Sequence, residues 1–360
     1  MRLFAHALLG ALAVLALCNS AWCVEEESAQ DRADALVAAG QPAQAIEVLT
    51  RAVSVLRRSG GLYDPRQSAL LNQLVDLHSL QGDIDSAIAD LAYIERVSER
   101  THNRHSTQHA TTLAGIGAWH CRLGRFDTGR ERLRRSIERL HTEGDEQLID
   151  ALLGLARCSL DELAAEGVAT SPGSLDAYRG PMLRTNRMSV SSPAFQHRVQ
   201  KILRPDGEQA LRYAARLAET VTLPPERRVA VLLQAGDWFQ AKDHTRAARR
   251  YYASAQRWIL RTAGAEDPLA APVQVLYPVP TLALRAGRER ESSAVERFVE
   301  AEFTVRSDGH TDRVRAVTRE PGKSAADDTL QALQVARFRP RMTDGVAVDT
   351  EGVRFRQAFR

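Results

Sequence analysis

The stretch Leu36-Val-Ala-Ala-Gly-Gln-Pro-Ala-Gln-Ala-Ile46 decides how this chain folds, because its pattern returns twice. It recurs in type as Leu77-His-Ser-Leu-Gln-Gly-Asp-Ile-Asp-Ser-Ala-Ile88 and as Cys121-Arg-Leu-Gly-Arg-Phe-Asp-Thr-Gly129. The central residues Gly40, Gly82 and Gly124 are 42 residues apart each time (82 − 40 and 124 − 82). Each glycine lies between two stretches with helical apolar spacing, where it allows a left-handed turn. The period predicts a repeated helix-turn-helix unit.

A small residue follows each turn glycine by five positions, and these residues are Ala45, Ala87 and Gly129. A small side chain there allows two helices to approach closely. A leucine follows four positions later, at Leu49, Leu91 and Leu133, and completes an inward face of the second helix. Residues 231–255 form a fourth such unit, with Asp243 in the turn. We therefore expect about five helix pairs along residues 25–262.

This pattern resembles the tetratricopeptide repeat in the 42-residue form of kinesin-light-chain-like arrays. The starts of two units, Tyr63-Asp64-Pro65 and the segment 104–113, are similar to the openings of that family. The resemblance implies an all-α helical-repeat solenoid over residues 24–265 that binds protein partners. The Ser-, Pro- and Gly-rich stretch near 168–195 is expected to be an irregular insertion.

The hydrophobic period changes from helical to alternating after Phe298. Val299, Ala301, Phe303 and Val305 share one face of a predicted strand. A turn at Asp308-Gly309 leads to a second strand over 314–318, a helix opened by a capping box at 324–327, and a last strand over Val353–Phe359. The chain is thus predicted to be multidomain: the solenoid, a Pro-containing linker over 266–295, and a small α+β domain over 296–360 with the order strand, strand, helix, strand.

From about residue 272 onward the chain resembles the TonB C-terminal domain. The two share Tyr277-Pro278, Val299–Val305 with Asp308-Gly309, the helix containing Ala332 and Ala336, Phe338-Arg339-Pro340, residues 344–348, and the last strand. The resemblance implies that the last strand receives a partner segment by strand addition, through Val353, Arg354, Phe355, Arg356 and Gln357. The alternative is that this strand only completes the core and that residues 277–284 cover its edge.

Four polar residues are expected to face a binding groove of the repeats. Counted from the turn residues, Asn72, Asp76, Asp237 and Gln240 should project from first helices toward the inner side and bind a partner. The alternative is that they are ordinary solvated residues of exposed helix faces.

The first 23 residues have the features of a cleavable signal peptide. Met1-Arg2 is followed by the apolar run Ala7–Leu17 and by small residues before Val24. We therefore expect a periplasmic protein, with an inner-membrane anchor formed by residues 3–22 as the alternative. Lys and Arg total 48 against 45 Asp and Glu, so the net charge of +3 gives no electrostatic case for nucleic acid.

Cys121 and Cys158 are expected to occupy similar places in neighbouring first helices, about 10 Å apart, so free buried thiols are favoured over a disulfide. His102, His105 and His109 have helical spacing but are expected to be solvated. No hydrolase or zinc motif is present, so we expect no enzyme activity, no cofactor and no metal.

Together these features favour an exported, non-enzymatic adaptor of a Gram-negative cell envelope, whose repeats bind one protein and whose TonB-like domain binds another. The alternative is a component of TonB-dependent outer-membrane transport, with an outer-membrane receptor as partner.

Overall fold

The structure is a computed structural model that describes residues 29–140, 145–170, 192–261, 267–279, 297–318, 320 and 322–359. The predicted signal peptide, most of the predicted insertion, and residues 266 and 280–295 of the predicted linker lie outside the described residues. Contacts divide the chain into two compact units, Met1–Thr112 and Leu113–Arg360. Each unit is described by itself.

The first unit is entirely helical where it is described. A helix over residues 29–38 precedes three longer helices: α2 (Pro42–Gly60), α3 (Gln67–Gln81) and α4 (Ile84–Thr101). The first turn of α5 (Thr107–Arg122) also belongs to this unit. The side chain of Asp83 caps α4 by accepting a hydrogen bond from the backbone N–H of Ser86, 3.1 Å away.

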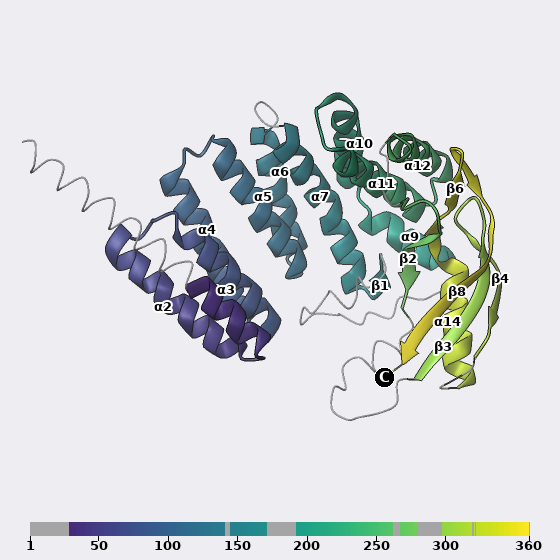
Figure 1. The fold of residues 1–360 in the computed structure, drawn as a ribbon, viewed down its shortest axis with the longest axis horizontal. Coiled ribbons are helices and arrows are strands. Elements are labelled where there is room, and N and C mark those ends of the chain that lie inside the picture. The colour runs from purple at the N-terminus through teal and green to yellow at the C-terminus, as the bar shows by residue number, and fades with distance from the viewer. Residues whose placement is uncertain are drawn as a thin grey trace, which may run out of the picture. The chain divides into compact units, whose positions relative to one another are not determined.

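The second unit continues the helices and ends in small antiparallel sheets (Figure 1). Its helices after α5 are α6 (Phe126–Leu140), α7 (Asp145–Ala165), α9 (Ser192–Ile202), α10 (Pro205–Thr220), α11 (Pro225–Ala241) and α12 (Thr245–Ile259). Helix α10 packs on α7, and α11 packs on α12. The described helices thus form five pairs, with α9 added between the members of the fourth.

The turn positions predicted from the period are confirmed. Gly40, Gly82 and Gly124 have φ values of 74°, 79° and 75°, and Asp243 has the same left-handed conformation with φ 65°. The small residues after the turns are also buried: Ala45 and Ala87 are completely inaccessible. A Cβ atom on Gly129 would lie 2.7 Å from the backbone oxygen of Gly117 in α5. Close helix approach therefore explains the small residues.

The sequence predicted three strands, whereas the described residues contain eight, so the structure adds strands that the alternation did not predict. The strands are β1 (Val168–Ala169), β2 (Val273–Pro278), β3 (Arg297–Val305), β4 (Thr311–Ala316), β5 (Arg337–Arg339), β6 (Arg341–Thr343), β7 (Val346–Val348) and β8 (Thr350–Phe359), with α14 (Lys323–Val335) between β4 and β5. The order strand, strand, helix, strand holds for β3, β4, α14 and β8.

Two sheets and a hairpin make up this C-terminal part. One sheet has the order β4-β3-β8, the second has the order β1-β2-β5, and β6 pairs with β7. Helix α14 contributes Ala332 and Leu333 to a core that also contains Phe303, Phe338 and Tyr277. Strand β2 lies inside the predicted linker. Its residues pair with β5, and its Tyr277 packs in this core, so this part of the chain is not merely a linker.

The predicted capping box at 324–327 is wrong. Helix α14 begins at Lys323 with Gly322 as its N-cap and has no side-chain cap hydrogen bond. Ser324 lies within the first turn, two positions after the N-cap, and so cannot act as the cap.

Across the described parts of the chain, no helix has both the length and the apolar composition needed to cross a membrane.

Candidate functional site

Strand β8 lies at an edge of its sheet and offers an outer row of backbone groups. It pairs with β3 so that Arg356 is opposite Glu300. The backbone groups of Glu300 point the other way, because its oxygen accepts from the N–H groups of Val317 and Thr318, and its N–H donates to Thr318 Oγ1. In an antiparallel pair both backbone groups of a residue point to the same side. The N–H and C=O groups of Arg356 therefore face away from β3.

The direction of the backbone groups alternates along β8, and this alternation divides the other predicted residues of the strand into two sets. Arg354, opposite Glu302, also directs its backbone groups outward, whereas Val353, Phe355 and Gln357 direct theirs toward β3. Within the described residues β8 pairs with β3 alone. The alternative in which residues 277–284 cover the edge fails for its described part, because β2 pairs with β1 and β5.

The side chains of β8 alternate as the sequence predicted. Val353 and Phe355 are half-buried against the core, and the Phe355 ring lies 4.8 Å from the Tyr277 ring. Arg354 and Arg356 are exposed on the other face. Arg354 Nη1 lies 3.2 Å from Glu300 Oε1, and the Arg356 guanidinium lies 3.5 Å from the centre of the Phe298 ring. Both arginine side chains thus lie over their own sheet, and among the described residues no strand pairs with the outer backbone edge of β8.

The opposite edge of the sheet is less regular. Arg313 in β4 has φ 51°, which an L-residue seldom adopts, and the pairing of β3 with β4 shifts register between Glu302 and Thr304. Such irregularity discourages pairing with a further strand. The pairing of β3 with β8 also shifts register, between Phe303 and Val305, but it is continuous over Val353–Phe359. This part of β8 is therefore the edge better suited to strand addition.

The four predicted groove residues divide into two kinds. Asn72 and Asp76 are exposed on α3, as expected. The exposure predicted for Gln240 and Asp237 is wrong. Gln240 is completely buried, and its Nε2 donates to the backbone oxygen of Asp308, 2.7 Å away. Asp237 is covered in part by the C-terminal strands.

Asp237 forms a two-pronged ion pair with Arg339 of β5. Arg339 Nε lies 2.9 Å from Asp237 Oδ1, and Nη2 lies 2.5 Å from Oδ2. The hydroxyl of Tyr252 also donates to Asp237 Oδ1, at 3.0 Å. Burial alone would lower the pKa of Arg339, but the Asp237 carboxylate raises it above its ordinary value. Arg339 therefore stays charged although it is almost fully buried.

Further contacts attach the C-terminal strands to α11 and α12. Asp243, in the turn between these helices, lies 3.0 Å from His310 Nε2 and 3.4 Å from Arg337 Nε. Gly345 N donates to Gln256 Oε1 at 2.6 Å. A Cβ on Gly309 would lie 2.2 Å from Gln240 Nε2 and 2.3 Å from the Phe338 oxygen, so only glycine fits there. The last helix pair and the C-terminal strands thus form one packed body.

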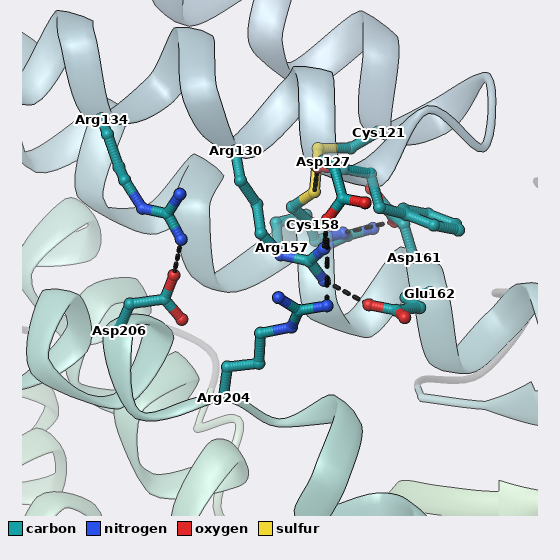
Figure 2. The surroundings of a disulfide bond; sticks show 11 residues. Cys121, Asp127, Arg130, Arg134, Arg157, Cys158, Asp161, Glu162, Arg204 and Asp206 are labelled. Atoms are coloured by element: carbon teal, nitrogen blue, oxygen red, sulfur yellow. Dashed lines mark hydrogen bonds and ion pairs between the residues drawn. A yellow bond between two sulfur atoms is a disulfide. The ribbon is translucent and has the colours of Figure 1, made fainter.

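Cys121 and Cys158 form a disulfide bond, so the expectation of free thiols is wrong (Figure 2). Their Cα atoms are 5.2 Å apart, about half the distance expected for neighbouring helix axes. A Cβ on Gly129 would lie 2.3 Å from Cys121 Sγ. The side of α6 that lies against Cys121 therefore has no side chain, and the two cysteine side chains meet beside it.

Charged groups surround the disulfide in Figure 2. Arg130 is buried and pairs with Glu162, while Arg157 Nε lies 3.6 Å from Asp161. Burial raises the pKa of Asp161 to about 6, against the lowering effect of Arg157 and Arg122. Burial, helped by Arg132 and Arg125, lowers the pKa of His120 to about 4. Both groups therefore titrate within the range that folding experiments use.

The histidines of the 102–109 segment form no metal site. His109 is buried, which corrects the expectation that it is solvated, and its Nδ1 lies 3.0 Å from Ser98 Oγ. Among the described residues, no three His, Cys, Asp or Glu side chains converge so that they could hold a metal ion.

Comparison with known proteins finds similarity at the level of solved structures. No protein-family model and no curated protein matches the sequence. The kinesin light chain TPR-like repeats of Podosopora anserina are 12% identical, with a TM-score of 0.46, and cover 66% of this chain and 97% of that one. BtubC (BKLC) of P. vanneervenii is also 12% identical, with a TM-score of 0.39, and covers 69% of this chain and 92% of that one. The TPR-like helical repeat itself is established here by the turn residues and the close helix packing of this chain.

Proposed function

We propose that this chain is an exported, non-enzymatic adaptor of the cell envelope that captures one partner by strand addition at β8 and another with its helical repeats. TPR-like repeats generally mediate protein–protein interaction, because stacked helix pairs present extended binding surfaces. The observation that carries the proposal is the backbone edge of β8, where the N–H and C=O groups of Arg354 and Arg356 point outward and no described strand pairs with them.

Two features support export. The N-terminal sequence has the charge, apolar run and small-residue exit of a signal peptide. The Cys121–Cys158 disulfide is stable in oxidising compartments and rare in reducing ones. Intact-mass measurement of the native protein tests this: a chain that begins between Ala21 and Val24 supports a periplasmic protein, and a chain that retains residues 3–22 supports the anchored alternative.

Strand addition requires main-chain hydrogen bonds on the outer side of β8. Proline at position 356 removes an outward N–H and leaves the pairing with β3 intact, because the backbone of Arg356 does not point toward β3. Proline at position 357 removes an N–H that faces β3 and should destabilise the sheet. The two variants carry proline at adjacent positions. Comparing them separates the loss of an outward hydrogen-bond donor from the loss of pairing within the sheet.

Photo-crosslinking in the native envelope provides the assay. Benzoylphenylalanine at position 354 should give an adduct with a partner protein, and Arg356→Pro should abolish it without lowering the thermal midpoint. The same probe at Asp327, which is exposed on α14, is the control and should give no such adduct. An unchanged adduct in folded Arg356→Pro, or the same adduct from position 327, would contradict strand addition.

A further inference from the structure

A cleft on the second unit has the chemistry of a peptide-binding site and is separate from the β8 edge. It lies among α6, α7 and α10 and has a volume of about 570 Å³. Its floor contains Leu152 and Leu155, and the half-buried Ile137 and Tyr213 flank them. The cleft is open to solvent and mostly apolar inside.

Three arginines stand at the rim of this cleft: Arg134, Arg212 and Arg216, all exposed. Two of them already have carboxylate partners. Arg134 Nη2 lies 2.5 Å from Asp206 Oδ2, as Figure 2 shows, and Arg212 Nη2 lies 3.1 Å from Glu208 Oε1. Arg216 has no carboxylate partner among the described residues and lies over the Tyr213 ring at 5.7 Å.

The carboxylates near the rim do not cancel this charge. Asp206 is fixed by Arg134 and by the backbone N–H of Gly207 at 2.9 Å. Although burial opposes it, these hydrogen bonds hold the pKa of Asp206 below its ordinary value, so Asp206 remains an ionised partner of Arg134. Glu208 is shared between Arg212 and Lys242 Nζ, the latter at 2.7 Å. Among the residues that line the cleft, three arginines thus stand against two carboxylates, Asp206 and Glu138, while Glu208 beside the cleft has Lys242 as a further cationic partner.

We propose that this cleft binds a segment of a partner protein in which leucine or phenylalanine side chains are flanked by carboxylates. The apolar side chains would fill the floor between Ile137 and Tyr213, and the carboxylates would pair with Arg216 and the outer faces of Arg212 and Arg134. The assignment deepens the proposed function, on which it rests, because it names the class of segment that the repeats bind.

The probe is the fluorescein-labelled hexapeptide Glu-Glu-Leu-Phe-Glu-Glu, compared with Lys-Lys-Leu-Phe-Lys-Lys and measured by fluorescence polarisation against the full chain at about 50 mM salt, where charge pairing is weakly screened. The acidic peptide should bind at least about tenfold more tightly than the basic one. Arg216→Glu should weaken its binding by about tenfold or more, since it replaces attraction with repulsion. Ile137→Asp should weaken binding in the same way, because it places a carboxylate beside the apolar floor.

Arg250→Glu is the matched control. Arg250 is exposed on α12 and does not line the cleft, and its substitution changes the net charge by the same amount as Arg216→Glu. It should leave the affinity within about twofold, as expected if charge acts locally. Equal binding of the two peptides, equal effects of Arg216→Glu and Arg250→Glu, or displacement of the acidic peptide by an oligothymidine would overturn the assignment. The β8 variants are not used here, so failure of the cleft leaves the crosslinking result at β8 standing on its own.

Discussion

The ion pair between Asp237 and Arg339 gives a quantitative test of how the C-terminal strands attach to the last helix pair. The perturbations are Asp237→Asn, which keeps the size of the side chain, and Arg339→Met, which replaces the guanidinium with an apolar group of similar length. Each single change leaves one charge without its partner. The double change leaves neither charge, so the two residues form a thermodynamic cycle.

The exposure of the two side chains sets the expected costs. The Arg339 side chain is 10% exposed and the Asp237 side chain 28% exposed. Removing one partner of a buried pair costs about 3–5 kcal/mol. Asp237→Asn strands the more buried charge, leaving Arg339 with the Pro268 oxygen at 3.4 Å, so we expect a loss of about 3–4 kcal/mol. Arg339→Met leaves the Asp237 carboxylate, which water reaches and which still accepts a hydrogen bond from Tyr252, so we expect a loss of about 2 kcal/mol in unfolding free energy.

Urea unfolding followed by the fluorescence of Trp238 and Trp258 provides the measurement, because both tryptophans lie in the helix pair that binds the strands. The double variant should lose about 2 kcal/mol less than the sum of the single variants. Glu131→Gln and Arg135→Met form the control cycle in the same unit. That pair is half exposed on α6, so its coupling should be at most about 0.5 kcal/mol.

Additive single changes, or a cost below about 1 kcal/mol for Asp237→Asn, would refute the reasoning, because a pair that is truly desolvated cannot be broken so cheaply. If the order of the two single costs were reversed, the burial assigned to Arg339 would be wrong.

Four further predictions concern stability. Ala87→Leu should cost about 1–3 kcal/mol by overpacking a site with no accessible surface, while Ala89→Leu on the exposed face of α4 should be nearly neutral in thermal unfolding. Replacing both Cys121 and Cys158 with Ala should remove about 4 kcal/mol, given their separation of 37 residues, and should make the unfolding midpoint insensitive to reductant; a midpoint that still falls on reduction would count against this bond. Asp161 has a pKa near 6 in the folded chain against 3.8 ordinarily, so the folded chain should lose up to about 3 kcal/mol of stability as the pH rises through that window. Asp161→Asn should therefore stabilise the chain at pH 8 but not at pH 3. His120 has a pKa near 4 in the folded chain against 6.5 ordinarily, so the folded chain should lose stability as the pH falls from 6.5 to 4, and His120→Gln should reduce this loss. Equal dependence of the unfolding free energy on pH in both variants and the parent chain would exclude both assignments.

The sequence was sufficient for features that depend on local spacing. A turn that needs a left-handed residue selects glycine, or Asp243 in the last pair, and two helices that cross closely select Ala45, Ala87 and Gly129. Alternation likewise predicted which side chains of β8 face the core. These requirements act over a few residues, so they leave a pattern that can be recognised along the chain.

The disulfide depended on a distance that spacing alone does not give. Similar positions in neighbouring first helices were expected to be about 10 Å apart, since helix axes usually pack at 8–10 Å. The Cα atoms of Cys121 and Cys158 are closer because both residues lie on the facing sides of their helices, next to the bare backbone at Gly129. The rotation of each helix about its axis, and not the repeat period, decided this result.

The groove residues show the same limit at the level of the whole unit. Asp76 lies six residues before Gly82, and Asp237 lies six residues before Asp243, so the period assigns them the same direction on their helices. On α3 the side chain at this position is exposed, whereas on α11 the same position accepts the guanidinium of Arg339. Periodicity predicts where a side chain points, but it contains no information about a segment 102 residues later that binds there. In the sequence, Phe338-Arg339-Pro340 was only one of the features shared with the TonB C-terminal domain, and nothing in it indicated that the arginine would be buried against a repeat. The helical repeats and the C-terminal strands could therefore each be predicted from the sequence, but the ion pair that joins them could be found only from three-dimensional contacts.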